Sequence, residues 1–159
     1  MNTIIAAALA ALMTAHGANA AEISARKALI SVMNAVGADC ENTEIAEITE
    51  ENAFILGLDG AFEGVLSAAM TLEASADGEG KFVVVCDGGK TSKKIYEHIV
   101  KHYEFPACDN ADRAAVLRAG NIVAHFKGTA ANVSAYCRAF GEKYGTGGVK
   151  IIKNPEKMR

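Results

Sequence analysis

The sequence predicts an α+β protein whose main domain spans residues 81–153. Three observations support this prediction: a valine-rich apolar run at residues 81–86, two helical patterns at 91–103 and 130–144, and a hairpin signal at 119–121. In chain order the elements read β-α-β-β-α-β. This order predicts a ferredoxin-like split βαβ sandwich, in which two helices cover one face of an antiparallel sheet.

The first half of this domain is a strand followed by a helix. The apolar run at 81–86 is typical of a central strand. Residues 91–103 place Ile95, Tyr96, Ile99 and Tyr103 on one helical face. The helix should end before Pro106, because the residue that precedes a proline avoids the helical region.

The second half begins with a hairpin. Residues 115–118 and 122–127 are predicted to be short strands, joined at Gly120 and Asn121, two residue types that accept positive φ. In the second strand Phe126 points to one face and His125 to the other. A helix at 130–144 and a last strand at 149–152 complete the domain, and residues 154–159 form a tail.

The segment before the sandwich, residues 21–80, is predicted to be helical with connections. Residues 21–36 have helical spacing and stop at Gly37. An acidic connection with a short strand follows at 39–51, and then an apolar strand or turn at 53–60. Residues 62–70 are predicted to form a short helix that Gly64 weakens, and residues 74–80 form a loop.

Residues 1–20 indicate export. An apolar run from Ile4 to Met13 is followed by a short polar stretch that closes on Ala18-Asn19-Ala20, the small-x-small pattern of a signal-peptide cleavage site. No Lys or Arg precedes the apolar run, so an Ala-rich first helix is the alternative. The expected location is the cell envelope or the exterior, with the cytoplasm as the alternative.

The charge and the apolar content of the chain limit the classes of binding partner to expect. The formal net charge is -3 and no long run of Lys or Arg is present, which disfavours nucleic-acid binding. No stretch reaches the roughly 20 apolar residues of a membrane span. A protein or a small molecule is therefore the expected partner.

Four cysteines are an even number, as in many exported proteins with disulfides. We predict the pairs Cys86 with Cys137 and Cys40 with Cys108. The first pair assumes that the helix at 130–144 crosses the sheet face to which Cys86 points. Four buried thiols that act as small apolar residues are the alternative. No C-x-x-C pair is present, so no metal site or other cofactor is predicted.

The stretch "KFVVVCDGGKTSKK" at residues 81–94 has the outline of a phosphate-binding loop. The pattern G-x-x-x-x-G-K-[ST] would require glycine at position 84, which is Val84, so nucleotide hydrolysis is not expected. A glycine turn with Thr91 or Ser92 as helix cap explains the residues. Weak anion binding at Gly89, Lys90 and Thr91 is the functional alternative.

The histidines do not cluster. His98 and His102 share a helix face, where a solvated surface is the simpler interpretation than a metal site. His125 could act as a base for Cys86, which ends a strand beside the glycine turn. A core or half-exposed histidine is the simpler interpretation of His125.

The stretches "ILGLDG", "GKFVVVCDGGKTSKKIYEHIVKHYEF" and "AAVLRAGNIVAHFKG" carry a family resemblance. Over residues 50–140 the chain resembles a bacterial domain of unknown function found in small exported and lipid-anchored proteins. The resemblance implies export and an α/β fold, and it implies no catalytic residue.

These observations predict a small exported binding or interaction domain that is not an enzyme. One alternative is a ligand-sensing regulatory domain that forms a homodimer through its sheet. A Cys-dependent enzyme is another, and fold alone does not choose among them.

Overall fold

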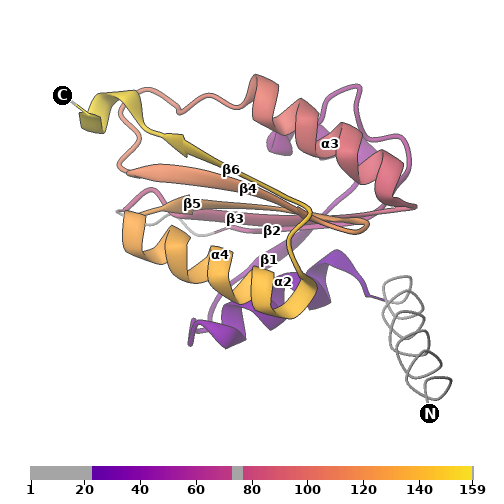
Figure 1. The fold of residues 1–159 in the computed structure, drawn as a ribbon, viewed down its shortest axis with the longest axis horizontal. Helices are drawn as coiled ribbons and strands as arrows, with labels where there is room; N and C mark the ends of the chain where they lie inside the picture. Colours follow the sequence, from indigo (N-terminus) through magenta and orange to yellow (C-terminus); the bar gives the residue numbers. More distant parts are fainter. Residues whose placement is uncertain (1–22, 73–76, 159) are drawn as a thin grey trace, which may run out of the picture.

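A single six-stranded antiparallel sheet organises the molecule (Figure 1). The computed structural model describes residues 23–72 and 77–158. The strands lie in the order β1-β2-β3-β5-β4-β6. The predicted signal peptide, residues 1–20, lies outside the described residues, so its cleavage stays a prediction.

The elements follow the chain in the order α2, β1, η2, β2, β3, α3, β4, β5, α4, β6, η3. The strands are β1 (Ile45–Ile48), β2 (Val65–Thr71), β3 (Gly80–Cys86), β4 (Arg113–Ala119), β5 (Ile122–Gly128) and β6 (Gly148–Lys153). The α-helices are α2 (Ala25–Ala35), α3 (Gly89–His102) and α4 (Ala130–Tyr144), and the short 3₁₀ helices are η2 (Glu50–Leu56) and η3 (Pro155–Met158).

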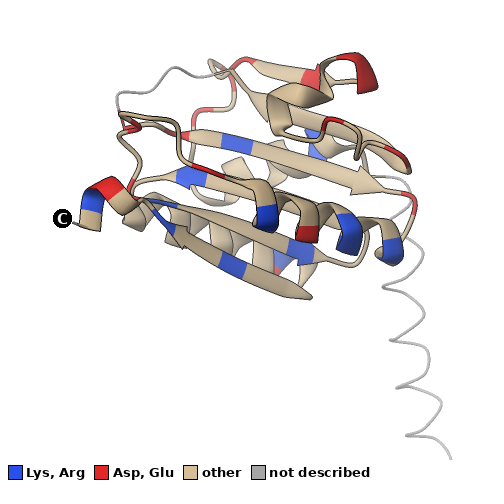
Figure 2. Ribbon diagram, turned by 90° about the horizontal axis from the view of Figure 1, so that it is seen from above, with Lys and Arg blue, Asp and Glu red and all other residues tan. Residues whose placement is uncertain are grey.

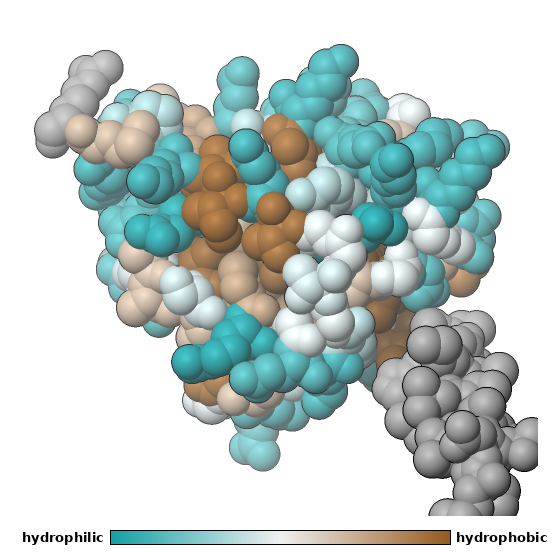
Figure 3. Space-filling model, viewed as in Figure 1, coloured by the Kyte–Doolittle hydropathy of each residue, from teal (hydrophilic) through white to brown (hydrophobic). Residues whose placement is uncertain are grey.

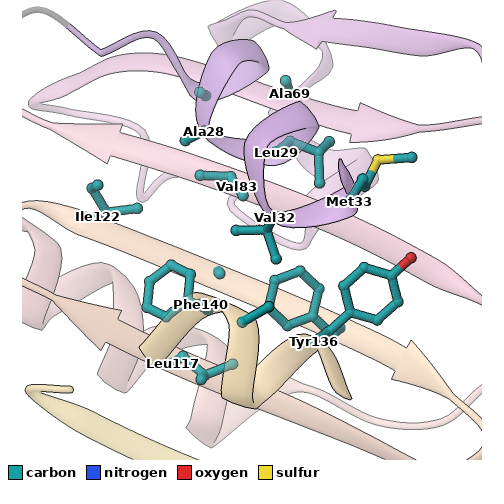
Figure 4. Packing of buried hydrophobic residues seen from close by; sticks show 14 of the residues in the cluster. Ala28, Leu29, Val32, Met33, Ala69, Val83, Leu117, Ile122, Tyr136 and Phe140 are labelled. Atoms are coloured by element: carbon teal, nitrogen blue, oxygen red, sulfur yellow. The ribbon is translucent and has the colours of Figure 1, made fainter. Parts of the chain in front are cut away.

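Helices cover both faces of the sheet. Helices α2 and α4 lie side by side on one face, where Leu29, Val83 and Phe140 belong to the larger core cluster (Figures 1 and 4). Helix α3 and η2 cover the other face, where Val84 and Ile99 belong to a second cluster. The sheet therefore separates two apolar cores, as the continuous apolar sequence of β3 permits.

The prediction that both sandwich helices share one face is wrong. The element order of residues 81–153 is confirmed, but β6 pairs with β4, whereas a ferredoxin-like fold would place it beside β3. That edge of β3 is taken by β2. The N-terminal strands thus displace β6 to the opposite side of the sheet.

The position of β6 explains why the helices separate. Strands β3 and β4 are parallel, because both are antiparallel to β5; strands β5 and β6 are parallel, because both are antiparallel to β4. Helix α3 connects β3 to β4, and α4 connects β5 to β6, and both connections move toward the β6 edge of the sheet. Their starting strands, β3 and β5, run in opposite directions. Crossovers between parallel strands strongly prefer one hand, so α3 and α4 must lie on opposite faces.

The prediction of a short helix at 62–70 is also wrong, because residues Val65–Thr71 form β2. Its sequence, VLSAAMT, contains good helix formers, but pairing with β1 and β3 outweighs that propensity. Residues 21–80 therefore supply two strands of the same sheet. The first predicted helix is confirmed as α2, with Ser24 as its N-cap.

The predicted hairpin between β4 and β5 is confirmed. Ala119 pairs with Ile122, and Gly120 between them has φ of +55°. Asn121 ties this turn to the end of β3, since its side-chain amide donates to the carbonyl of Cys86 at 3.0 Å. Ser92 of α3 donates to the carbonyl of Gly120 at 2.6 Å, so the hairpin also fixes the start of that helix.

Candidate functional site

A pocket of about 350 Å³ lies on the α3 side of the sheet. Ligand sites in proteins typically start near 300 Å³. Five separate parts of the chain line it: η2 with Gly57, the strands β2, β3 and β5, and the end of α3 together with the loop that follows it. Its lining residues are Ile55, Leu56, Gly57, Met70, Gly80, Lys81, Phe82, Ile99, His102, Tyr103, Glu104, Pro106, His125 and Lys127.

Three rings in contact form one wall of the pocket. The imidazole of His125 lies 4.7 Å from the Phe82 ring, with an interplanar angle of 14°. These residues are cross-strand partners on β3 and β5, which brings their side chains together. The Tyr103 ring, just after α3, also contacts the imidazole, with a centroid distance of 4.7 Å and an interplanar angle of 49°. His125 is therefore packed against two aromatic rings.

Two polar atoms of this wall have no partner. His125 Nε2 and the Tyr103 hydroxyl are buried, and neither makes a hydrogen bond to any described residue. The His125 residue as a whole is 5 % exposed. Buried polar groups nearly always have a partner in folded proteins, and leaving one unsatisfied costs about 1–3 kcal/mol. Both atoms belong to residues that line the pocket, and both lack a hydrogen-bond partner there.

The surroundings keep both groups uncharged near neutral pH. Burial, and to a smaller degree the nearby Lys127 ammonium, lowers the pKa of His125 to about 3. Burial and the Asp109 carboxylate raise the pKa of Tyr103. At pH 7 the wall therefore presents a neutral imidazole and a protonated phenol.

The two lysines of the lining each have a counter-ion. Lys127 Nζ lies 2.6 Å from Asp109 Oδ2, in an ion pair whose side chains are 19 % and 4 % exposed. The Lys81 ammonium pairs with Glu79 at 2.9 Å and lies over the Tyr136 ring of α4, so this side chain belongs to the opposite face of the sheet. Glu104 is an exposed lining residue, where the pocket meets solvent.

The residues predicted as a weak anion site lie elsewhere, at the start of α3. Helix α3 begins at Gly89, and Gly88 is its N-cap, so capping by Thr91 or Ser92 is wrong. Instead, Thr91 donates a hydrogen bond to Asp87 at 2.5 Å, which places a carboxylate at this end of the helix. That negative charge competes with an external anion for the helix N-terminus. Anion binding at Gly89, Lys90 and Thr91 stays a prediction.

The predicted disulfides are not formed. All four cysteines lie in the described part of the chain, and none is bonded to another. Cys86 belongs to the core on the α3 side, whereas Cys137 packs against the core on the α2 and α4 side. The sheet lies between them, because α4 crosses the face opposite to the one we expected.

Thiol labelling should distinguish these cysteines. Cys108 is exposed, so we expect it to react within minutes with an aromatic disulfide reagent. Cys86 is fully buried, and burial raises the pKa of its thiol to about 12, so it should react only on unfolding. The folded variant Cys108→Ser should lack the fast phase of thiol labelling. Fast labelling of Cys86 in the folded protein would contradict the structure.

Cys86 and His125 do not form a pair of nucleophile and base. His125 is opposite Phe82, four residues along β3 from Cys86, which corresponds to about 13 Å of strand. His98 and His102 have ring centroids 4.7 Å apart, and the His98 ring bonds the Gly57 carbonyl at 2.9 Å. Within residues 23–72 and 77–158, no group of three metal-ligating side chains is assembled.

Sequence reasoning singled out His125 but missed Tyr103 as a site residue. The helical spacing predicts Tyr103 only as part of the apolar face of its helix, and its hydroxyl is the one local signal of a polar role. Nothing in the local sequence indicates that η2 approaches the end of α3. The pocket therefore follows from the tertiary arrangement.

No helix among the described residues combines the length and the apolar character needed to cross a membrane. The family resemblance found in the sequence stays a prediction. Comparison of the chain with known protein families, curated proteins and solved structures found no match.

Proposed function

We propose that this protein is an exported, non-enzymatic binding module that holds a small molecule in the pocket beside His125. The observation that carries this proposal is the pair of buried, unpartnered polar atoms, His125 Nε2 and the Tyr103 hydroxyl, on the wall of a mostly apolar cavity. Such a combination of apolar lining and few polar groups is the usual composition of a ligand site.

The chemistry favours binding over catalysis. A general base works best with a pKa near the operating pH, and the pKa of His125 is lowered to about 3. A nucleophilic cysteine requires an accessible thiolate, whereas Cys86 is buried and its pKa is raised. Both groups that sequence reasoning considered for catalysis are thus poorly suited to it.

A probe set with one benzene ring tests the proposal: phenol, toluene, benzoate and benzylamine. Titration into isotope-labelled protein should shift the methyl signals of Met70 and Ile99, which line the pocket, in a saturable way. The methyl signals of Leu66 and Val149, which are exposed and outside the lining, are the internal control. If no probe produces saturable shifts at Met70 and Ile99, the proposed function is wrong.

The alternative is a ligand-sensing domain that forms a homodimer through its sheet. Because helices cover both faces, only an edge strand could pair, and β6 is one edge. Val149 and Ile151 on β6 are 46 % and 40 % exposed, and apolar surface gathers where this strand runs (Figures 1 and 3). Lys150 and Lys153 on the same strand oppose edge pairing. Light scattering across a concentration series, with and without phenol, distinguishes this alternative.

A further inference from the structure

We infer that the molecule bound beside His125 is uncharged, mostly apolar, and carries a hydroxyl group that bonds both Tyr103 and His125. This inference rests on the proposed function and names the class of ligand for the same pocket. It follows from the charge balance of the lining, from the two unpartnered atoms and from the character of the walls.

The charges of the lining disfavour a charged ligand. The one ammonium group that faces the pocket, Lys127, already has its counter-ion, Asp109, at 2.6 Å among the described residues. Lys81 has its own partner on the opposite face of the sheet. A ligand carboxylate would lose its hydration without gaining an uncompensated opposite charge, which is costly in a buried site. A ligand ammonium would meet only Glu104, which lies exposed where the pocket meets solvent and where water screens the attraction.

The lysines outside the pocket do not alter this balance. Helix α3 carries Lys90, Lys93, Lys94 and Lys101, interspersed with Glu97 (Figure 2). None of these five residues belongs to the pocket lining. They can influence how fast a charged molecule approaches, but they offer no contact to a ligand seated beside His125.

The unpartnered atoms favour a hydroxyl. The Tyr103 phenol stays protonated and can donate a hydrogen bond to the ligand oxygen. The neutral imidazole of His125 accepts at Nε2 when its proton is on Nδ1, so the ligand O–H can donate to it. A hydroxyl is the smallest group that accepts from one neighbour and donates to the other. A purely apolar ligand would leave both atoms unsatisfied.

The remaining lining selects an apolar body. Leu56, Phe82 and Ile99 are buried, and Met70 is half-buried. The volume of about 350 Å³ lies at the lower end of the range for small-molecule sites, which suits a compact ligand. Together these features select a small alcohol or phenol over a sugar, a nucleotide or an amino acid, which expose many polar groups.

The same four probes test the class of ligand by their order of affinity. We expect phenol to bind roughly tenfold more tightly than toluene, because it adds hydrogen bonds at two buried sites. Benzoate and benzylamine should bind more weakly than toluene. In Tyr103→Phe the affinity for phenol should fall roughly tenfold while that for toluene is unchanged. Tyr96→Phe is the matched control, since Tyr96 lies on α3 outside the lining and should leave both affinities unchanged.

The outcomes separate this inference from the proposed function. If benzoate or benzylamine binds saturably and with higher affinity than phenol, the pocket remains a ligand site, but its preference for uncharged molecules is overturned. Equal affinity for phenol and toluene, with no effect of Tyr103→Phe, would show that water alone satisfies the two atoms and would overturn the role of the hydroxyl. His125→Phe provides a second variant, which should likewise weaken phenol and spare toluene.

Discussion

The variant His125→Phe is expected to lose much of the acid sensitivity of the wild-type protein. In the folded state the pKa of His125 is lowered to about 3, whereas an unfolded histidine has a pKa near 6.5. Below pH 6.5 the unfolded chain therefore takes up a proton that the folded chain refuses, and stability falls as the pH falls. Between pH 7 and pH 4 this residue alone should remove roughly 3 kcal/mol from the free energy of unfolding.

Urea unfolding at pH 7, 6, 5 and 4 measures this effect as the difference between wild type and variant. Phenylalanine keeps the stack on Phe82 and removes an unpartnered nitrogen, so the variant should be at least as stable as wild type at pH 7. His102→Gln is the control, because it removes an exposed histidine and leaves the buried one in place. Parallel curves for wild type and His125→Phe would mean that the imidazole is not buried in its neutral form.

The variant Phe126→Ala should destabilise the protein by about 3–5 kcal/mol. Phe126 is fully buried on the face that α2 and α4 cover, one residue from His125 but on the opposite side of the sheet. The centroid of its ring lies 5.1 Å from that of Tyr136, on which it stacks, and 6.3 Å from that of Phe140, so Phe126 joins β5 to α4. Truncation removes apolar contact on both neighbours and leaves a cavity.

The matched control is Phe54→Ala, because Phe54 of η2 is 65 % exposed. Exposed positions outside special features usually change stability by less than about 0.5 kcal/mol. The midpoint of urea unfolding at pH 7 measures both variants. A small effect of Phe126→Ala, similar to that of Phe54→Ala, would contradict the core described for this face.

The local signals predicted the elements of the second half well. The alternation at 122–127 assigned Phe126 and His125 to opposite faces, as the two core clusters and the buried imidazole confirm. The Gly120 turn and both sandwich helices are also confirmed. These features depend on side-chain period and turn chemistry, which are local properties of the chain.

The sheet order depended on information that no local signal contains. Whether β6 pairs with β3 or β4 is decided by which edge the N-terminal strands occupy, and the sequence of β2 predicts a helix in place of that strand. Without β2, the sequence also predicts the wrong sheet face for α4, and therefore the wrong pairing of Cys86 with Cys137. The site was hidden for a related reason, since Tyr103 and His125 meet only when α3 packs on β5.

The separation of the two cores by the sheet gives the molecule two layers that can open independently. Helix α3 buries three side chains, Ser92, Ile95 and Ile99, whereas α4 buries four and packs beside α2, which buries five. Regions with less buried apolar contact open at a lower free energy. Amide hydrogens of α3 should therefore exchange with solvent sooner than those of α4, and a guest could enter beneath α3 while the opposite layer stays closed.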